Sequence, residues 1–204
     1  EVIQADLTRD EDIRRIVLRL QNLSRPIDVL INNAGFGINK SFLASETSEE
    51  IALLDVLVTA PMRLMHAALP AMKERDSGTI INVSSVAGWI AGGTYSAAKS
   101  YLTVLTESLH TELSQTNITV HALCPGFTRT EFHQRGGMKM GGLPNWLWLS
   151  AEEVVAHAWK SAKAGKVISV PGRIYKTLSF ISRFGPRPIV RKMGMNVRVR
   201  QRKK

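Results

Sequence analysis

The sequence predicts an α/β fold built on a three-layer, doubly wound parallel sheet. Short β-branched and apolar runs alternate with longer stretches of helical periodicity, and Asn, Ser or Pro-Gly turns follow the runs. The predicted strands span 26–31, 79–83, 117–124 and 166–170, and the predicted helices span 11–23, 47–72, 94–113 and 150–163. With 204 residues, of which 44% are hydrophobic, the chain suits one domain with a substantial core.

Turn and capping residues set the expected ends of these elements. Residues 1–7 have the pattern of the end of a strand followed by Asp-Leu. The Asp of this pair, Asp6, suits a cap or turn ahead of the first helix. Pro61 lies inside the second helix and predicts a kink there. The predicted N-terminal caps of the later helices are Thr47, paired with Glu50 in a capping box, then Thr94, then Ser150 with acids behind it.

The stretch 78–103 carries the candidate chemistry. Its strand ends at Ser84-Ser85, and the following helix places Tyr95 and Lys99 four residues apart, on one face. A phenol with a pKa of about 10 is a poor acid–base catalyst near neutrality, but a neighbouring ammonium favours the phenolate. With a Ser hydroxyl to hold a carbonyl oxygen, the trio suits hydride transfer between a carbonyl or alcohol and a nicotinamide. Tyr and Lys at this spacing also occur as a core phenol and a surface ammonium, so the surrounding sequence decides.

Four motifs in a fixed order make the chain similar to the short-chain dehydrogenase/reductase family. They are Asn32-Asn33-Ala34-Gly35 after a strand, residues 67–72 closing a helix, the block from Ser85 to Lys99, and residues 125–130 after another strand. The resemblance covers roughly residues 5–170. It implies a Rossmann-like sheet and an NAD(P)-dependent oxidoreductase. In that enzyme Ser85, favoured over Ser84, orients the carbonyl, Tyr95 is the acid–base group, and Lys99 tunes its pKa and anchors the ribose.

The same resemblance implies the cofactor contacts. Asp6 occupies the position of an Asp that meets the adenine, while Asn32, Ala34 and Gly35 line the adenosine side and Asn33 ties adjacent strands together. The other implied contacts are those of Tyr95, Lys99, Pro125, Gly126, Thr128 and Thr130. The cofactor is NAD or NADP, with a slight preference for NADP. The residues that discriminate between the two usually lie on a strand that this sequence lacks.

The chain departs from the family in three places. The Gly-rich turn that holds the pyrophosphate has no counterpart upstream of Asn32, so we interpret the chain as lacking the first β-α-β unit. It is then a fragment, or a protein without half of its cofactor site, and its sheet should expose a long apolar edge. Leu57 stands where the family usually has an Asn that helps hold a relay water. The loop between Ser85 and Tyr95 is about three residues shorter than is usual in the family.

The remaining residues bear on the substrate and on metals. Residues 132–149 mix Gly with Met, Leu and Trp, which suits a mobile lid over a lipophilic substrate or a loop packed on its own core. His121 is interpreted as a core residue and Cys124 as a buried strand residue. The His residues show no metal-like grouping, so we predict no metal site.

Charge divides the chain into two parts. Residues 1–153 hold 13 basic and 17 acidic residues, a net charge of −4, whereas residues 154–204 hold 14 basic and no acidic residues. We predict a catalytic domain over 1–172 and a basic helix and tail over 173–204. This basic end either contacts an anionic membrane surface or is a solvated tail, and we do not expect nucleic acid as a partner.

These observations define the expected function. No run of about 18 apolar residues and no signal peptide is visible, so we expect a cytoplasmic protein. We predict an oxidoreductase for a small lipophilic carbonyl or alcohol. The family resemblance implies that it assembles as a homodimer or homotetramer through the helices 47–72 and 94–113. The alternative is a catalytically impaired family member, or a fragment, that acts through protein or membrane-surface interaction.

Overall fold

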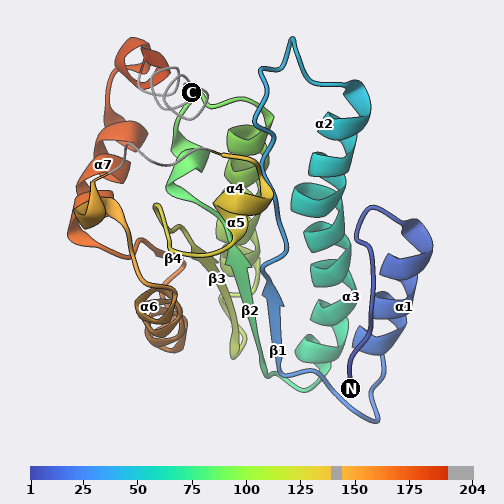
Figure 1. Cartoon of the computed structure of the whole chain (residues 1–204). Helices are drawn as coiled ribbons and strands as arrows, with labels where there is room; N and C mark the ends of the chain where they lie inside the picture. Colours follow the sequence, from blue (N-terminus) through green and yellow to red (C-terminus); the bar gives the residue numbers. More distant parts are fainter. Residues whose placement is uncertain (139–143, 193–204) are drawn as a thin grey trace.

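A parallel four-stranded sheet forms the centre of the protein, as predicted (Figure 1). The computed structural model describes residues 1–138 and 144–192. The strands lie side by side in chain order, and they are β1 (Val29–Asn32), β2 (Gly78–Val83), β3 (Ile118–Leu123) and β4 (Ile168–Ser169). Each parallel pair is joined by a helical crossover, as this arrangement requires. The α/β class and the parallel sheet are therefore confirmed.

Helices cover the two faces of the sheet. On one face lie α1 (Asp10–Leu20), α3 (Ala60–Glu74) and α4 (Thr94–Glu112), which share a core with Ile80 and Val120. On the other face α6 (Ala151–Lys163) packs on Ile81 and Leu123. Alternate residues of a strand point to opposite faces, which is why neighbours such as Ile80 and Ile81 serve different cores. The described part also contains α2 (Thr47–Leu54), α5 (Phe132–Arg135), α7 (Arg173–Phe184), and the helical turns η1 (Asp55–Thr59), η2 (Val86–Trp89) and η3 (Asn145–Leu147).

The predicted strand at residues 1–7 is wrong. This segment is irregular and ends in a turn, because no strand of the sheet lies beside it to form a hydrogen-bonded ladder. The order of the sheet makes β1 an edge strand, paired only with β2. Val29 and Ile31 point to the face of the sheet on which α6 packs over β2 and β3, and they are 36% and 55% exposed. The sheet therefore has an edge strand with exposed apolar side chains, but with four residues this edge is shorter than the long one predicted.

Two of the three predicted N-terminal caps are shifted by one residue. Glu46, not Thr47, caps α2, and it forms the reciprocal capping box with Glu49. Gly93, not Thr94, precedes α4, with a φ of 81° that favours glycine. Ser150 caps α6 as predicted, since its hydroxyl accepts a hydrogen bond from the Glu153 N–H.

The long helical segment Thr47–Glu74 is interrupted where a kink was predicted. Residues Asp55–Thr59 form a π-helical turn immediately before Pro61, which has no N–H to donate to the preceding turn. By length and composition this segment could span a membrane, although half of its most apolar window is buried inside the protein. Its contacts with α1, α4 and the sheet identify it as a core element.

The C-terminal region begins with α7, which packs against η2. Its buried Tyr175 anchors it to the segments around Phe127 and Leu147. The division into a domain over 1–172 and a basic region over 173–204 stays a prediction. Residues 139–143 of the predicted lid and residues 193–204 of the predicted tail lie outside the described residues.

Candidate active site

A cavity of about 1300 Å³ opens at the carboxyl ends of the strands. This is where open α/β sheets bind ligands, because the loops that leave neighbouring strands diverge there. The loops after β1, β2 and β3 line it, together with the first two turns of α4 and parts of α5, α6 and α7. The volume exceeds the few hundred to about 1000 Å³ typical of drug-sized ligands, so the cavity has room for more than one small molecule.

The structure brings Ser85, Tyr95 and Lys99 together at this cavity, as predicted. Ser85 follows β2 by two residues and caps the helical turn η2, where its hydroxyl accepts a hydrogen bond from the Ala87 N–H at 3.1 Å. Tyr95 lies in the first turn of α4, and the Lys99 ammonium one turn later lies 5.7 Å from its ring centroid. The Lys99 Nζ donates a hydrogen bond to the Val83 carbonyl at 2.6 Å. The C-terminal end of β2 and the first turns of α4 thus place all three groups.

The neighbouring Ser84 has a structural task. It is 2% exposed, and its hydroxyl donates to the Lys99 carbonyl at 2.7 Å and lies 2.6 Å from the Thr103 hydroxyl. These bonds hold β2 against α4. Besides the turn contact, the Ser85 hydroxyl lies 3.5 Å from the Pro125 carbonyl and faces the Tyr95 side chain. Ser85 is therefore the hydroxyl that a ligand could recruit.

Burial controls the ionisation of the trio, and here one expectation is wrong. Burial raises the pKa of Tyr95 to about 12, although an interaction with the Ser85 side chain opposes the increase. Burial also lowers the pKa of Lys99 to about 8, against the influence of Cys124. The pKa of Tyr95 is thus raised, where the sequence predicted a lowering by Lys99, because desolvation of the phenol dominates. At neutral pH this phenol is protonated and can donate a proton.

Leu57 closes the site on the side of the π-helical turn. It is 1% exposed and belongs to an apolar cluster with Leu53, Val56 and Ala98, against which the Tyr95 ring packs. A Cβ placed on Gly35 would lie 2.9 Å from the Leu57 Cδ2 and 3.9 Å from the Lys99 Nζ. Leu57 and the Lys99 ammonium thus both border Gly35, and the Leu57 side chain has no hydrogen-bonding group to offer there.

The roles predicted for Asn32 and Asn33 are exchanged in the structure. Asn32 is 7% exposed and donates to the Asn82 side chain at 2.7 Å, so it ties β1 to β2. Asn82 continues the network by donating to the Thr106 hydroxyl at 2.9 Å. Asn33 lines the cavity, followed by Ala34 and Gly35. The side-chain period of two in a strand explains the exchange, since the predicted register was off by one residue.

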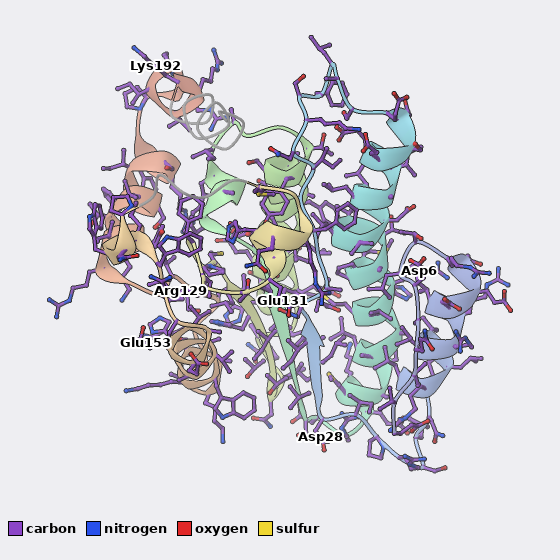
Figure 2. All side chains as sticks on the ribbon, in the orientation of Figure 1. Asp6, Asp28, Arg129, Glu131, Glu153 and Lys192 are labelled. Atoms are coloured by element: carbon purple, nitrogen blue, oxygen red, sulfur yellow. The ribbon has the colours of Figure 1, made fainter. Side chains whose placement is uncertain are left out.

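The other predicted cofactor residues divide between the cavity and the surface. Pro125, Gly126, Thr128 and Thr130 line the cavity after β3, as predicted. Asp6 does not line it: its carboxylate accepts hydrogen bonds from the N–H and hydroxyl of Thr8, a turn ahead of α1. Figure 2 shows Asp6 beside α1, far from the cavity residue Glu131 beside α5. Asp6 was predicted either to meet the adenine or to form a turn before the first helix. Its hydrogen bonds with Thr8 are those of the turn.

A nicotinamide cofactor fits the residues at this end of the cavity. Residues 33–35 offer a strip of backbone, and the glycine at its end leaves open the approach to the Lys99 Nζ. Thr128 and Thr130 add hydroxyl groups from the opposite loop. Backbone amides and short polar side chains are the donors that dinucleotide sites use.

Tyr175 is a site residue that the sequence did not reveal. It is 4% exposed, and its hydroxyl accepts from the Phe127 N–H at 3.1 Å and donates to the Leu147 carbonyl at 2.6 Å. Its ring lies where a Cβ on Gly126 would stand, 2.1 Å away, so only glycine permits this contact. The partners lie 28 and 48 residues away in the sequence, and no local pattern marks such a contact.

Aromatic side chains line the wall opposite the trio. Phe132 of α5 lies 5.9 Å from Tyr95, and His133 lies 5.3 Å from both Phe132 and Trp148, measured between ring centroids. Burial lowers the pKa of His133, which keeps this ring neutral. Of the described part of the predicted lid segment, Phe132, His133, Arg135 and Met138 line the cavity, and Trp148 packs behind His133.

His121 and Cys124 serve the core, as predicted. The His121 ring nitrogens lie 2.6 Å from the Lys166 carbonyl and 2.8 Å from the Ser169 hydroxyl, which fastens β4 to β3. Cys124 is fully buried, and burial raises the pKa of its thiol to about 11. Among the residues that the structure describes, no three His, Cys, Asp or Glu side chains group as metal ligands do.

Comparison with known proteins identifies the relatives of this chain. A family model described as short chain dehydrogenase matches residues 1–139. A ketoacyl reductase, HetN, of a Nostoc species is 36% identical over 128 residues, which are 61% of this chain and 45% of that protein. The chain thus spans less than half the length of this curated relative.

Solved structures with the same fold cover more of the chain. A short-chain dehydrogenase from Sphingobium yanoikuyae, in complex with NADPH, has a TM-score of 0.79 and 28% identity, over 100% of this chain and 78% of that one. An alcohol dehydrogenase from Comamonas testosteroni, described as specific for bulky-bulky ketones, has a TM-score of 0.76 and 26% identity, over 100% and 76%. In both, about a quarter of the neighbour has no counterpart here.

Proposed function

The chain belongs to the short-chain dehydrogenase family, and on that premise we propose that it interconverts a carbonyl and an alcohol with NAD or NADP as the hydride carrier. The observation that supports this function best is the convergence of Ser85, Tyr95 and Lys99 at the cavity beyond the strands. Such a cluster supplies a hydrogen-bond donor, a proton donor and a cation within one small volume.

Each residue has one step in the proposed mechanism. Residues 33–35 and Lys99 would hold the nicotinamide cofactor, which would supply a hydride to the carbonyl carbon in reduction. The Ser85 hydroxyl donates a hydrogen bond to the carbonyl oxygen, and the Tyr95 phenol transfers its proton to that oxygen as negative charge develops there. The Lys99 ammonium stabilises the phenolate that remains. Oxidation of the alcohol reverses these steps. With its pKa raised to about 12, the phenol carries its proton at neutral pH, as the acid of the reduction requires.

We propose a lipophilic substrate, supported by the walls of the cavity. Phe127, Phe132 and Met138 line one side, and Val154, Val155 and Trp159 of α6 line another. Apolar walls with a few convergent polar groups favour a ligand with one polar function on a hydrocarbon body. The names of two similar proteins, a ketoacyl reductase and a bulky-bulky ketone specific alcohol dehydrogenase, are consistent with this class.

The slight preference for NADP stays part of the proposal. It is supported by the NADPH bound to the Sphingobium dehydrogenase, which covers the whole of this chain. Titration of the protein with NADH and NADPH, followed by nicotinamide fluorescence, measures both affinities. The intact mass of the native protein, compared with the 22.6 kDa of this chain, shows whether further residues contribute to the site.

Replacement of the phenol tests the catalytic proposal. We expect Tyr95→Phe to lower the rate of reduction of a hydrophobic ketone by at least about a hundredfold, because the proton donor is removed while the ring is kept. The matched control is Tyr101→Phe, on the same helix and 40% exposed, which should leave the rate unchanged. Equal rates for the two variants would refute the role of Tyr95.

Leu57 supports a second candidate function. Because it places hydrocarbon beside Lys99, the chain could be a catalytically impaired family member that acts through protein or membrane-surface contacts. We expect Leu57→Asn to raise the reduction rate severalfold if this side chain limits proton relay. Leu53→Asn is the matched control, since Leu53 is equally buried in the same cluster and should reproduce only the loss of stability. No activity in any variant, together with no cofactor binding, would favour the second candidate.

The proposal includes partners and location. Exposed apolar side chains on α4, such as Tyr101 and Val104, and on α2, such as Ile51, support a homodimer or homotetramer through these helices. Sedimentation of the native protein measures this assembly. Cytoplasmic location and peripheral membrane contact by the basic C-terminal region are proposed with it.

A further inference from the structure

Helix α7 packs on the protein through one tyrosine and two serines, and it exposes large apolar side chains to solvent. Tyr175, Ser179 and Ser182 are 4%, 6% and 5% exposed and lie on one face of the helix. The outward side chains are Ile174 at 41%, Phe180 at 64%, Ile181 at 42% and Phe184 at 68% exposed. An ordinary surface helix has the opposite arrangement, with its apolar stripe toward the core. This inversion marks the outward face of α7 as a contact surface.

The exposed apolar surface continues beyond the helix. The Phe180 and Phe184 rings lie 5.0 Å apart between centroids, so they form one aromatic patch. Ile189 is 54% exposed, while the neighbouring Val190 is fully buried and fixes the segment after Pro186 to the protein. The surface is therefore presented by anchored backbone.

Positive charge surrounds this surface. Residues 173–192 contain six basic and no acidic residues. Lys176 and Arg187 are exposed, and the Arg183 guanidinium lies 5.3 Å from the Trp89 ring centre and 3.5 Å from the Glu107 carboxylate. A helix with aromatic and aliphatic side chains beside Lys and Arg is the pattern of an element that lies in a membrane interface.

The same helix forms a wall of the cavity. Tyr175, Ser179 and Ser182 of its inner face line the cavity, and so do the exposed Val155 and Trp159 of α6, which are 64% and 43% exposed. Figure 1 shows α6 and α7 on the side of the molecule opposite α1. The apolar contact surface and the cavity thus share one element.

We propose that the outward face of α7, with Phe180, Phe184 and Ile189, docks on the surface of an anionic lipid bilayer. The rings enter the boundary between headgroups and acyl chains, and Lys176 and Arg187 pair with the lipid phosphates. The docked helix holds the adjacent cavity at the bilayer, from which a lipophilic substrate reaches it. This last step rests on the proposed function, whereas docking itself does not.

The charges argue against a second copy of the chain as the occupant. A symmetric dimer through α7 would place the same patch on both sides of the contact. The exposed Lys176 and Arg187 would then lie near their own copies, and the segment 173–192 has no acidic residue to pair with them, which repels the copies. Nucleic acid would satisfy the charges but not the exposed Phe and Ile side chains. An anionic bilayer satisfies both.

Vesicle flotation with the full chain tests the proposal. The probes are vesicles of phosphatidylcholine alone and vesicles with about 30% phosphatidylglycerol, at low and high salt. We expect binding to the anionic vesicles that weakens with salt. Phe180→Ser with Phe184→Ser should reduce the partition coefficient at least tenfold, because two aromatic anchors are lost. The matched control is Phe42→Ser with Leu43→Ser, at positions 62% and 96% exposed on the loop before α2.

A charge reversal separates the electrostatic contribution. Lys176→Glu with Arg187→Glu should lower anionic-vesicle binding by roughly fivefold or more for each site. Arg14→Glu with Lys73→Glu makes the same change on exposed positions of α1 and α3 and should have little effect. All these substitutions are at exposed positions, so thermal unfolding should stay near that of the wild type.

The outcomes decide between the occupants. No flotation of the wild type, or equal loss in the paired controls, would overturn the proposal. Loss of self-association in the Phe180→Ser, Phe184→Ser variant, without any change in flotation, would instead assign the patch to a second copy. Flotation needs no cofactor or substrate, so docking can fail while ketone reduction stands, and the reverse also holds.

Discussion

Lys99 is an ammonium held in a largely apolar setting, 4% exposed, with Leu57 on one side and the Val83 carbonyl as its hydrogen-bond acceptor. Its folded-state pKa is about 8, below the ordinary value of 10.5, because burial penalises the charged form. Below pH 8 the residue is charged in the folded and unfolded states, and the penalty is fully present. Between pH 8 and 10.5 the folded state loses the proton first, so stability rises with pH.

We therefore predict a pH-dependent difference between the wild type and Lys99→Met. The free energy of unfolding of the wild type should rise relative to that of the variant by up to about 3 kcal/mol between pH 7 and 10.5. Urea unfolding at several pH values measures this difference. Comparison with the variant is needed because the raised pKa values of Cys124 and Tyr95 lower stability above pH 9 and 10 in both proteins.

The control for this prediction is Lys73→Met, at an exposed position of α3. Its difference from the wild type should not change over the same pH range. A constant difference for Lys99→Met as well would show that the ammonium is solvated, and the site would then be more open beside Leu57 than the contacts of Gly35 indicate.

At the scale of elements, α7 is held to the cavity by one side chain. The Tyr175 hydroxyl joins the Phe127 N–H to the Leu147 carbonyl, and its ring fills the space above Gly126. We predict that Tyr175→Phe lowers the free energy of unfolding by about 1–3 kcal/mol, since it leaves a donor and an acceptor without their partner. Chemical denaturation measures the loss. Tyr101→Phe, on exposed α4 surface, should lose less than about 0.5 kcal/mol, and equal losses would contradict the anchoring role.

Local patterns predicted the elements well and their boundaries less well. Helical periodicity and β-branched runs placed every strand of the described sheet, because these signals depend on neighbouring residues. Periodicity does not fix the position of an element to a single residue. For this reason the predictions missed the caps at Glu46 and Gly93 and exchanged Asn32 with Asn33. The order of motifs placed Ser85, Tyr95 and Lys99 correctly at one cavity.

What the sequence did not predict depends on distant partners. Residues 1–7 have a strand-like pattern but lack a neighbouring strand, and a ladder needs two. Tyr175 reaches the site through contacts across the whole C-terminal third of the chain. The raised pKa of Tyr95 follows from burial, which the spacing between Tyr95 and Lys99 does not report. These features are set by packing in three dimensions.

At the scale of the whole molecule, the described sheet is open and has two edge strands, β1 and β4, of which β1 is the longer. β1 pairs only with β2, and Val29 and Ile31 expose their side chains on one face beside that edge. Unpaired N–H and C=O groups next to exposed apolar side chains form a template for pairing with another chain. The protein should therefore self-associate through β1 whenever no further segment covers it.

We predict that Val29→Lys suppresses this association in the 204-residue chain, because a charge on an edge strand repels a second strand and stays hydrated. Static light scattering over a range of protein concentrations measures the apparent mass. Val155→Lys is the matched control: it places the same charge on α6, at a residue 64% exposed, and should leave association through β1 unchanged. Equal suppression by both variants would assign the association to net charge alone. A rise in mass with concentration that only Val29→Lys abolishes would identify β1 as the contact.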